Sequence, residues 1–97
     1  MGVGQPTLEG IPTESVISVG AASTSVLSAN PDRTYLQLIN DSDSIIYVAL
    51  DGGDAALNEG TRLNASGGSA VFDTYIPNGA VKAISSGASK KLLVVEG

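Results

Sequence analysis

The stretch TYLQLINDSDSIIYVAL, residues 34–50, decides the fold class of this chain. Within residues 34–40, Leu36 and Leu38 occupy alternate positions, as on one face of a β-strand. Residues 44–50 are rich in β-branched and aromatic side chains, which favour strands. Because a short polar turn joins the two runs, the sequence predicts an antiparallel hairpin.

Six further short runs have strand composition and are separated by turns that contain glycine, proline or asparagine. They are residues 15–19, 24–29, 61–64, 69–73, 80–85 and 91–96. The last run is apolar on both faces, which is typical of a strand in the interior of a sheet. About eight strands at a spacing near ten residues predict a β-sandwich or a small barrel. We expect an all-β fold, a single antiparallel β-sandwich that is jelly-roll-like, because that topology needs eight strands.

Two segments depart from this strand pattern. Residues 51–60 are ambiguous, since they can form a loop or one helical turn capped by Asp54. Residues 1–14 contain glycines and prolines that break regular pairing, together with the apolar Val3, Leu8 and Ile11. We expect an extended N-terminal arm over residues 1–14, either frayed or ordered across a neighbouring subunit, and a β-sandwich domain over residues 15–97.

Composition excludes several classes of function. The chain has 97 residues, enough for one domain, and it contains neither histidine nor cysteine. Disulfides, zinc fingers, thiolate nucleophiles and imidazole bases are therefore excluded. The net charge of −5 repels phosphate backbones, so we expect no nucleic-acid partner. No apolar run approaches the roughly 20 residues that span a bilayer, so we expect no membrane partner.

Catalytic and metal-binding patterns are weak throughout the sequence. Serines are plentiful, but none precedes Lys82, Lys90 or Lys91 by the three residues of an S-x-x-K motif. The acidic pairs 41/43 and 51/54 could supply oxygen ligands to Ca²⁺, yet Asp at a β-turn is expected for local hydrogen bonding alone. We expect a protein that is not an enzyme and that has no catalytic residue, no cofactor and no metal site.

Aromatic residues offer two alternatives. Tyr35, Tyr47 and Tyr75 could form a sugar-stacking platform, but Tyr35 and Tyr47 lie on the two arms of the expected hairpin, where a cross-strand pair is the simpler account. Tyr75, Ile76 and Pro77 fall outside the alternating pattern. They either cover the end of a sheet or contact another chain.

The run ANPDRTYLQLIN, residues 29–40, resembles small tailed-bacteriophage virion proteins of the head-decoration, or cement, type. In these proteins an A-N-P-x-R turn leads into a strand that ends in Asn, and a second strand reads I-Y-V, as residues 46–48 do here. Further matches lie at residues 60–63, 67–69, 76–84 and 94–96. The resemblance covers residues 24–97 and leaves the N-terminal arm outside it.

The resemblance implies a jelly-roll-like sandwich on the outer surface of a capsid, soluble in the host cytoplasm before assembly. The implied partners are the major capsid protein and further copies of the chain, as a dimer or trimer that bridges capsid subunits. It implies turn and strand-end roles for Asn30, Arg33 and Asn40. The alternative is a receptor- or glycan-binding module of a phage tail or head fibre.

The candidate partner contacts are Val3, Leu8, Ile11, Tyr75 and Ile76.

Overall fold

Eight β-strands and no helix make up residues 12–97, which are the residues that this computed structural model describes. The strands are β1 (Thr13–Val19), β2 (Thr24–Leu27), β3 (Leu36–Asn40), β4 (Ile46–Ala49), β5 (Thr61–Leu63), β6 (Ser69–Phe72), β7 (Val81–Ser85) and β8 (Lys90–Glu96). Each expected strand is present, and the boundaries differ from the expected ones by one or two residues. The first strand starts two residues earlier than expected, so Thr13 and Glu14 belong to β1 and not to the arm.

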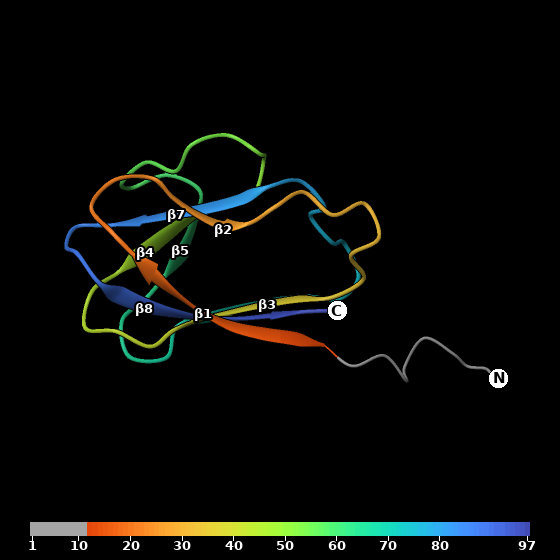
Figure 1. The fold of residues 1–97 in the computed structure, drawn as a ribbon. Helices are drawn as coiled ribbons and strands as arrows, with labels where there is room; N and C mark the ends of the chain where they lie inside the picture. The colour runs from red at the N-terminus through yellow and green to blue at the C-terminus, as the bar shows by residue number, and fades with distance from the viewer. Residues whose placement is uncertain (1–11) are drawn as a thin grey trace, which may run out of the picture.

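The strands form two stacked antiparallel sheets, with the orders β1-β8-β3-β6 and β2-β7-β4-β5 (Figure 1). Consecutive strands lie in different sheets, except for β4 and β5, which are neighbours in one sheet. This is the strand order of a jelly roll, in which two four-stranded sheets are linked by repeated crossings. The predicted all-β sandwich of eight strands is therefore confirmed.

The predicted hairpin of residues 34–50 is wrong. β3 pairs with β6 and β8, whereas β4 pairs with β5 and β7 in the other sheet. Leu36 and Leu38 of β3 are fully buried, as are Ile46 and Val48 of β4. Leu36 and Leu38 do share one face of their strand, as expected, but this face and the face with Ile46 and Val48 meet across the core instead of lying side by side. The loop between them therefore turns a corner from one sheet to the other.

The side chain of Asn40 stabilises this corner by hydrogen bonds. Its side chain is fully buried, and its Nδ2 donates to the carbonyl oxygens of Ser44 at 2.7 Å and Leu63 at 2.9 Å. The hydroxyl of Ser42 donates to Asn40 Oδ1 at 2.6 Å. These bonds join the end of β3, the β3–β4 loop and the end of β5. A buried amide needs such partners, because an unpaired polar group inside a protein is costly.

Aliphatic side chains fill the space between the sheets. The fully buried ones include Leu36, Leu38, Leu92 and Val94 from one sheet and Ile46, Val48, Leu63 and Val81 from the other. Each side chain of this size contributes about 1.5–3 kcal/mol when it is fully buried. β8 lies between β1 and β3, so the prediction that this doubly apolar strand is interior is confirmed.

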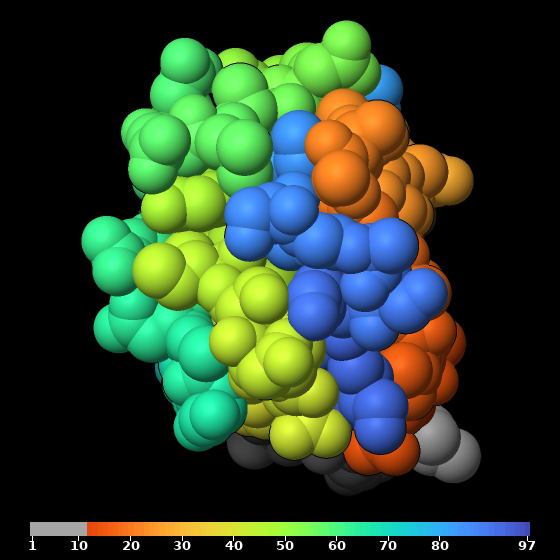
Figure 2. Space-filling view, turned by 90° about the vertical axis from the view of Figure 1, so that its left-hand side faces the viewer, coloured from red at the N-terminus to blue at the C-terminus, as the bar shows by residue number. Residues whose placement is uncertain are grey.

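The end of the molecule that carries the β3–β4 and β7–β8 loops faces the viewer in Figure 2. The two loops are joined there by an ion pair between Lys90 Nζ and Asp43 Oδ1, which are 2.7 Å apart. Lys91 Nζ lies 3.9 Å from Asp41 Oδ2 beside it. The candidate contact residues that the structure describes lie at the opposite end, where the β2–β3 and β6–β7 loops meet.

Candidate interaction surface

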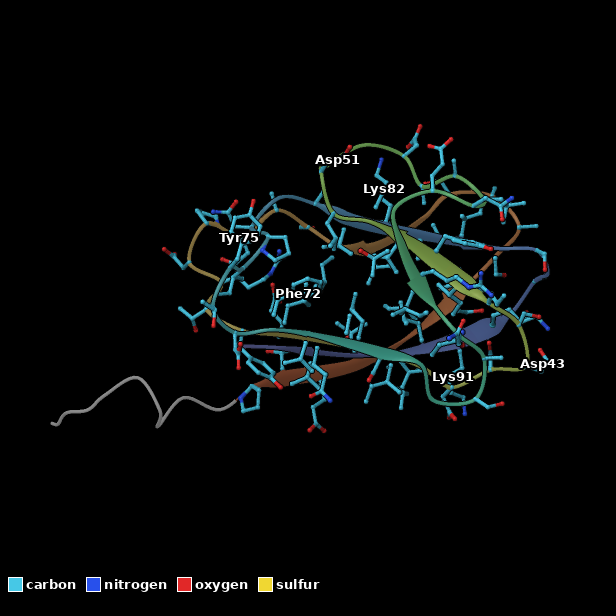
Figure 3. The ribbon with its side chains drawn as sticks, turned by 180° about the vertical axis from the view of Figure 1, so that it is seen from behind. Asp43, Asp51, Phe72, Tyr75, Lys82 and Lys91 are labelled. Atoms are coloured by element: carbon cyan, nitrogen blue, oxygen red, sulfur yellow. The ribbon has the colours of Figure 1, made fainter. Side chains whose placement is uncertain are left out.

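An open hollow of about 580 Å³ lies between the loop that follows β4 and the loop that follows β6. Phe72, Tyr75 and Ile76 line one side of it, and Asp51 and Glu59 belong to the other. Figure 3 shows Phe72 between the two sheets and Tyr75 at the end of the molecule. The hollow therefore combines an apolar wall with an acidic rim.

Tyr75, Ile76 and Pro77 are covered by the sandwich to different extents. Pro77 is buried and Ile76 is half-buried, so this part of the segment packs against the sandwich. Tyr75 is 82% exposed. A large exposed aromatic side chain beside a hollow is an anchor of the kind that binding surfaces use. Val3, Leu8 and Ile11, the other candidate contacts, lie outside the described residues.

A buried arginine fixes the loop that carries Tyr75. The Arg33 side chain has no exposed area, and its Nε lies 2.8 Å from Oε2 of Glu96. Its Nη1 donates to the carbonyl oxygens of Pro77 and Gly79, and its Nη2 donates to that of Ser28 at 2.9 Å. One guanidinium group thus ties the β2–β3 loop and the β6–β7 loop to the end of β8.

Asn30 adds to the same junction. Its backbone N–H donates to the carbonyl of Asn78 at 2.9 Å, and its Nδ2 donates to Glu96 Oε2 at 3.2 Å. Its Oδ1 accepts from the backbone N–H of Asp32 at 3.1 Å, which closes an Asx turn. The turn and strand-end roles expected of Asn30, Arg33 and Asn40 are confirmed. The loop that presents Tyr75 is therefore tied to the rest of the sandwich at Pro77, Asn78 and Gly79.

Aspartate side chains on the acidic side of the hollow are held by local hydrogen bonds and by an ion pair. Asp51 Oδ1 accepts from the backbone N–H of Gly53 at 2.9 Å, and Asp54 Oδ1 lies 3.0 Å from Nζ of Lys82. Residues 51–60 form a loop, so the alternative of a helical turn capped by Asp54 is wrong. The N–H of Glu59 donates to the carbonyl of Ala56 in a single turn of that loop.

The acidic pairs 41/43 and 51/54 do not come together to form one site. Asp41 and Asp43 face Lys91 and Lys90, and the Lys90 ammonium lowers the pKa of Asp43 by a hydrogen bond and by its charge. Within residues 12–97, no three acidic side chains come together in a way that could hold a metal ion. The three lysines thus act as ion-pair partners of aspartates.

The three tyrosines do not share a surface, and the expected cross-strand pair is wrong. Tyr35 precedes β3 in one sheet, and its hydroxyl donates to Gln37 Oε1 at 3.1 Å. Tyr47 belongs to β4 in the other sheet, and its hydroxyl donates to Asn58 Oδ1 at 2.9 Å. Tyr75 is therefore the tyrosine that remains available to a partner at the hollow.

Sequence reasoning missed a second surface, on the outside of the β1-β8-β3-β6 sheet. Val16 is 61% exposed and Val71 is 49% exposed. Half-buried aliphatic side chains of β3 and β8 lie between them, so that an apolar patch crosses the sheet. We call this set the outer apolar face; it consists of Val16, Ile39, Val71, Leu93 and Val95. The signal was present in residues 91–96, whose second apolar face was assigned only to an interior position in the sheet.

The chain is thus an all-β protein with a jelly-roll sandwich and two candidate contact surfaces. No protein-family model matches it, and neither a curated protein nor a solved structure does so. Among the residues that the structure describes, no helix has the length and hydrophobicity needed to cross a membrane.

Proposed function

We propose that this protein is a structural virion protein that decorates and stabilises a bacteriophage capsid by binding between capsid subunits. The observation that carries the proposal is the exposed Tyr75, held on a loop that the buried Arg33 clamps. A cement protein needs a rigid body with a fixed adhesive side chain, because ordering a flexible loop at the contact would weaken binding. The fold supports this role by analogy, since jelly rolls occur in viral capsid domains.

The partners in this proposal are the major capsid protein and further copies of the chain. Tyr75 and Ile76 are the contacts on the body of the protein, and Val3, Leu8 and Ile11 are the contacts on the arm. A repeated lattice lets several modest contacts act together, so that avidity replaces high affinity at each site. The acidic surface of the protein supports a location on the outside of the shell, away from the packaged DNA.

Co-sedimentation with expanded empty capsids of the encoding phage tests the proposal. We expect binding in near-stoichiometric amount and a higher melting temperature of the shell. Tyr75→Ser should lower capsid occupancy by at least five-fold. Leu57→Ser, at a residue that is 43% exposed on the β4–β5 loop, is the matched control and should leave occupancy unchanged. Absence of capsid binding by the unmodified protein would reject the proposal.

A receptor- or glycan-binding module is the second candidate. The observation in its favour is that Tyr75 lies beside a hollow that also contains Asp51 and Asn78, since a stacking ring next to polar groups suits a sugar. Saturable glycan binding that Tyr75→Ser abolishes, together with no capsid binding, would establish this function instead.

A further inference from the structure

The outer apolar face differs from the outside of the other sheet. Strand alternation places Ile39, Leu93 and Val95 outward, because their neighbours in β3 and β8 are buried in the core. On the β2-β7-β4-β5 sheet, the outward positions include Arg62 and Lys82. An antiparallel sheet that faces water normally alternates apolar-in with polar-out. The β1-β8-β3-β6 sheet departs from this alternation along its centre, where Val16, Leu93 and Ile39 face outward.

The strand register places these outward residues in three parallel rows. The central row consists of Val16, Leu93 and Ile39, which are paired across β1, β8 and β3. The row on one side contains Glu14, Val95, Gln37 and Val71, which are paired across β1, β8, β3 and β6. The row on the other side contains Ser18, Lys91 and Asp41. The central apolar row is therefore flanked by one row in which Glu14 lies beside the apolar Val95 and by another in which Lys91 lies 3.9 Å from Asp41.

We propose that the outer apolar face is the interface between two copies of the chain, related by a two-fold axis that runs along the row Val16–Leu93–Ile39. Under this symmetry Val16, Leu93 and Ile39 each contact the same residue of the other copy. The Glu14 row of each copy lies over the Lys91 row of the other. Each Glu14 carboxylate then comes beside a Lys91 ammonium, twice in the dimer, as an isologous interface requires.

The charges on this face fit a second copy. Lys91 pairs only loosely within its own chain, at 3.9 Å from Asp41, and both side chains are more than half exposed. Lys91 is therefore available to Glu14 of a second copy. Complementary charges around an apolar centre fix the orientation of the two partners more than they add to affinity.

The area of the outer apolar face limits the area that the dimer can bury. The four strands contain 23 residues, and a rise of about 3.3 Å per residue with a strand spacing of about 4.8 Å gives a footprint of about 360 Å². A standard interface buries about 800 Å² on each partner. The face is therefore about half the standard size, and we expect the dimer to dissociate on dilution.

The dimer deepens the proposed function, which includes further copies of the chain among the partners. Sedimentation equilibrium of the full chain, from about 5 to 500 µM, tests it without any capsid, so that its failure is distinguishable from a failure of capsid binding. We expect a monomer–dimer equilibrium. Val16→Asp, which places a charge in the central row at an exposed position, should raise the dissociation constant at least ten-fold. Ser25→Asp, on the outer face of the other sheet, is the control and should leave it unchanged. Thermal unfolding confirms that both variants fold.

A charge exchange tests the symmetry itself. Glu14→Lys alone and Lys91→Glu alone each bring like charges together and should each weaken the dimer about three-fold or more. The double variant Glu14→Lys/Lys91→Glu should restore it. A chain that stays monomeric up to 500 µM, a dimer indifferent to Val16→Asp, a double variant without restoration, or a trimer would each overturn the proposal.

Discussion

Nε of Arg33 and Oε2 of Glu96 lie 2.8 Å apart, and the side chain of Arg33 has no exposed area. The pair joins the loop before β3 to the end of β8 at the point where the Tyr75 loop returns to the sandwich. A buried guanidinium is tolerated only where its charge and its N–H groups are satisfied. Here a carboxylate and three backbone carbonyls satisfy them, so that one side chain links the β2–β3 loop, the β6–β7 loop and the end of β8.

Removal of this guanidinium should be among the most damaging single substitutions in the protein. Arg33→Met keeps a long apolar stem but leaves the carbonyls of Ser28, Pro77 and Gly79 without their donor. We expect the free energy of unfolding, measured by urea denaturation, to fall by about 3–5 kcal/mol. Arg62→Met, at an exposed arginine, should change it by less than about 0.5 kcal/mol. A loss below about 1 kcal/mol for Arg33→Met would show that the junction is dispensable.

The corner at Asn40 gives a second stability prediction. Asn40→Ala removes the donor to the carbonyls of Ser44 and Leu63 and leaves both acceptors buried. Since each buried group left unsatisfied costs about 1–3 kcal/mol, we expect a loss of about 2–4 kcal/mol in the free energy of unfolding. Asn64→Ala, at an exposed asparagine, is the comparison and should be nearly neutral. Equal effects of the two variants would contradict the role of Asn40.

Gly60 should resist replacement because of its backbone conformation. Its φ is +81°, and a Cβ at this position would overlap the carbonyl oxygen of Val48 in the neighbouring strand β4. Gly60→Ala is expected to lower the free energy of unfolding by about 1–3 kcal/mol. Gly20→Ala places its Cβ at an ordinary distance of 3.8 Å from Thr24 Oγ1 and should be tolerated. A Gly60→Ala protein as stable as Gly20→Ala would refute this explanation.

The pKa of Asp43 is lowered by the Lys90 hydrogen bond and charge. Because the pKa is lower in the folded than in the unfolded chain, the pair stabilises the protein above about pH 4 and this contribution is lost as the pH falls through the folded value. The effect on stability is small, since the Asp43 side chain is 83% exposed. An NMR titration of the Asp43 carboxyl carbon should show that Lys90→Met raises this pKa, whereas Lys82→Met leaves it unchanged.

Deletion of residues 1–11 separates the arm from the sandwich. The truncated protein retains all of β1, including the pairing of Thr13 with Glu96, so its melting temperature should match that of the full chain. Under the proposed function, its occupancy on capsids should fall. If occupancy is unchanged, Val3, Leu8 and Ile11 are not capsid contacts.

Sequence patterns predicted the strands well and their partners poorly. Alternation reports which residues share a face, so Leu36 and Leu38 were correctly placed together, and the structure shows that this face is the buried one. It says nothing about which strand lies alongside, and the shortness of the connection at residues 41–45 favoured a hairpin over a corner. The corner depends on contacts between Asn40 and Leu63, which are distant in sequence.

The site was predicted in part for a similar reason. Tyr75 stood out because it interrupts the strand pattern. The role of Arg33 as a buried clamp was hidden, because its partners come from three separate segments and a charged residue in a turn is usually exposed. The outer apolar face was also hidden, since it forms only when β1, β8, β3 and β6 are placed in register.

The pairing of β1 with β8 links the first and last strands of the described domain along the whole length of β1. During synthesis, β1 leaves the ribosome before the strands that pack against it. Its apolar residues remain exposed until β8, the last strand, has been translated. Such non-local pairing makes acquisition of the native state slow, in the range of milliseconds to seconds. During synthesis in the cell, the chain therefore passes through an intermediate whose unpaired strand edge is prone to aggregation.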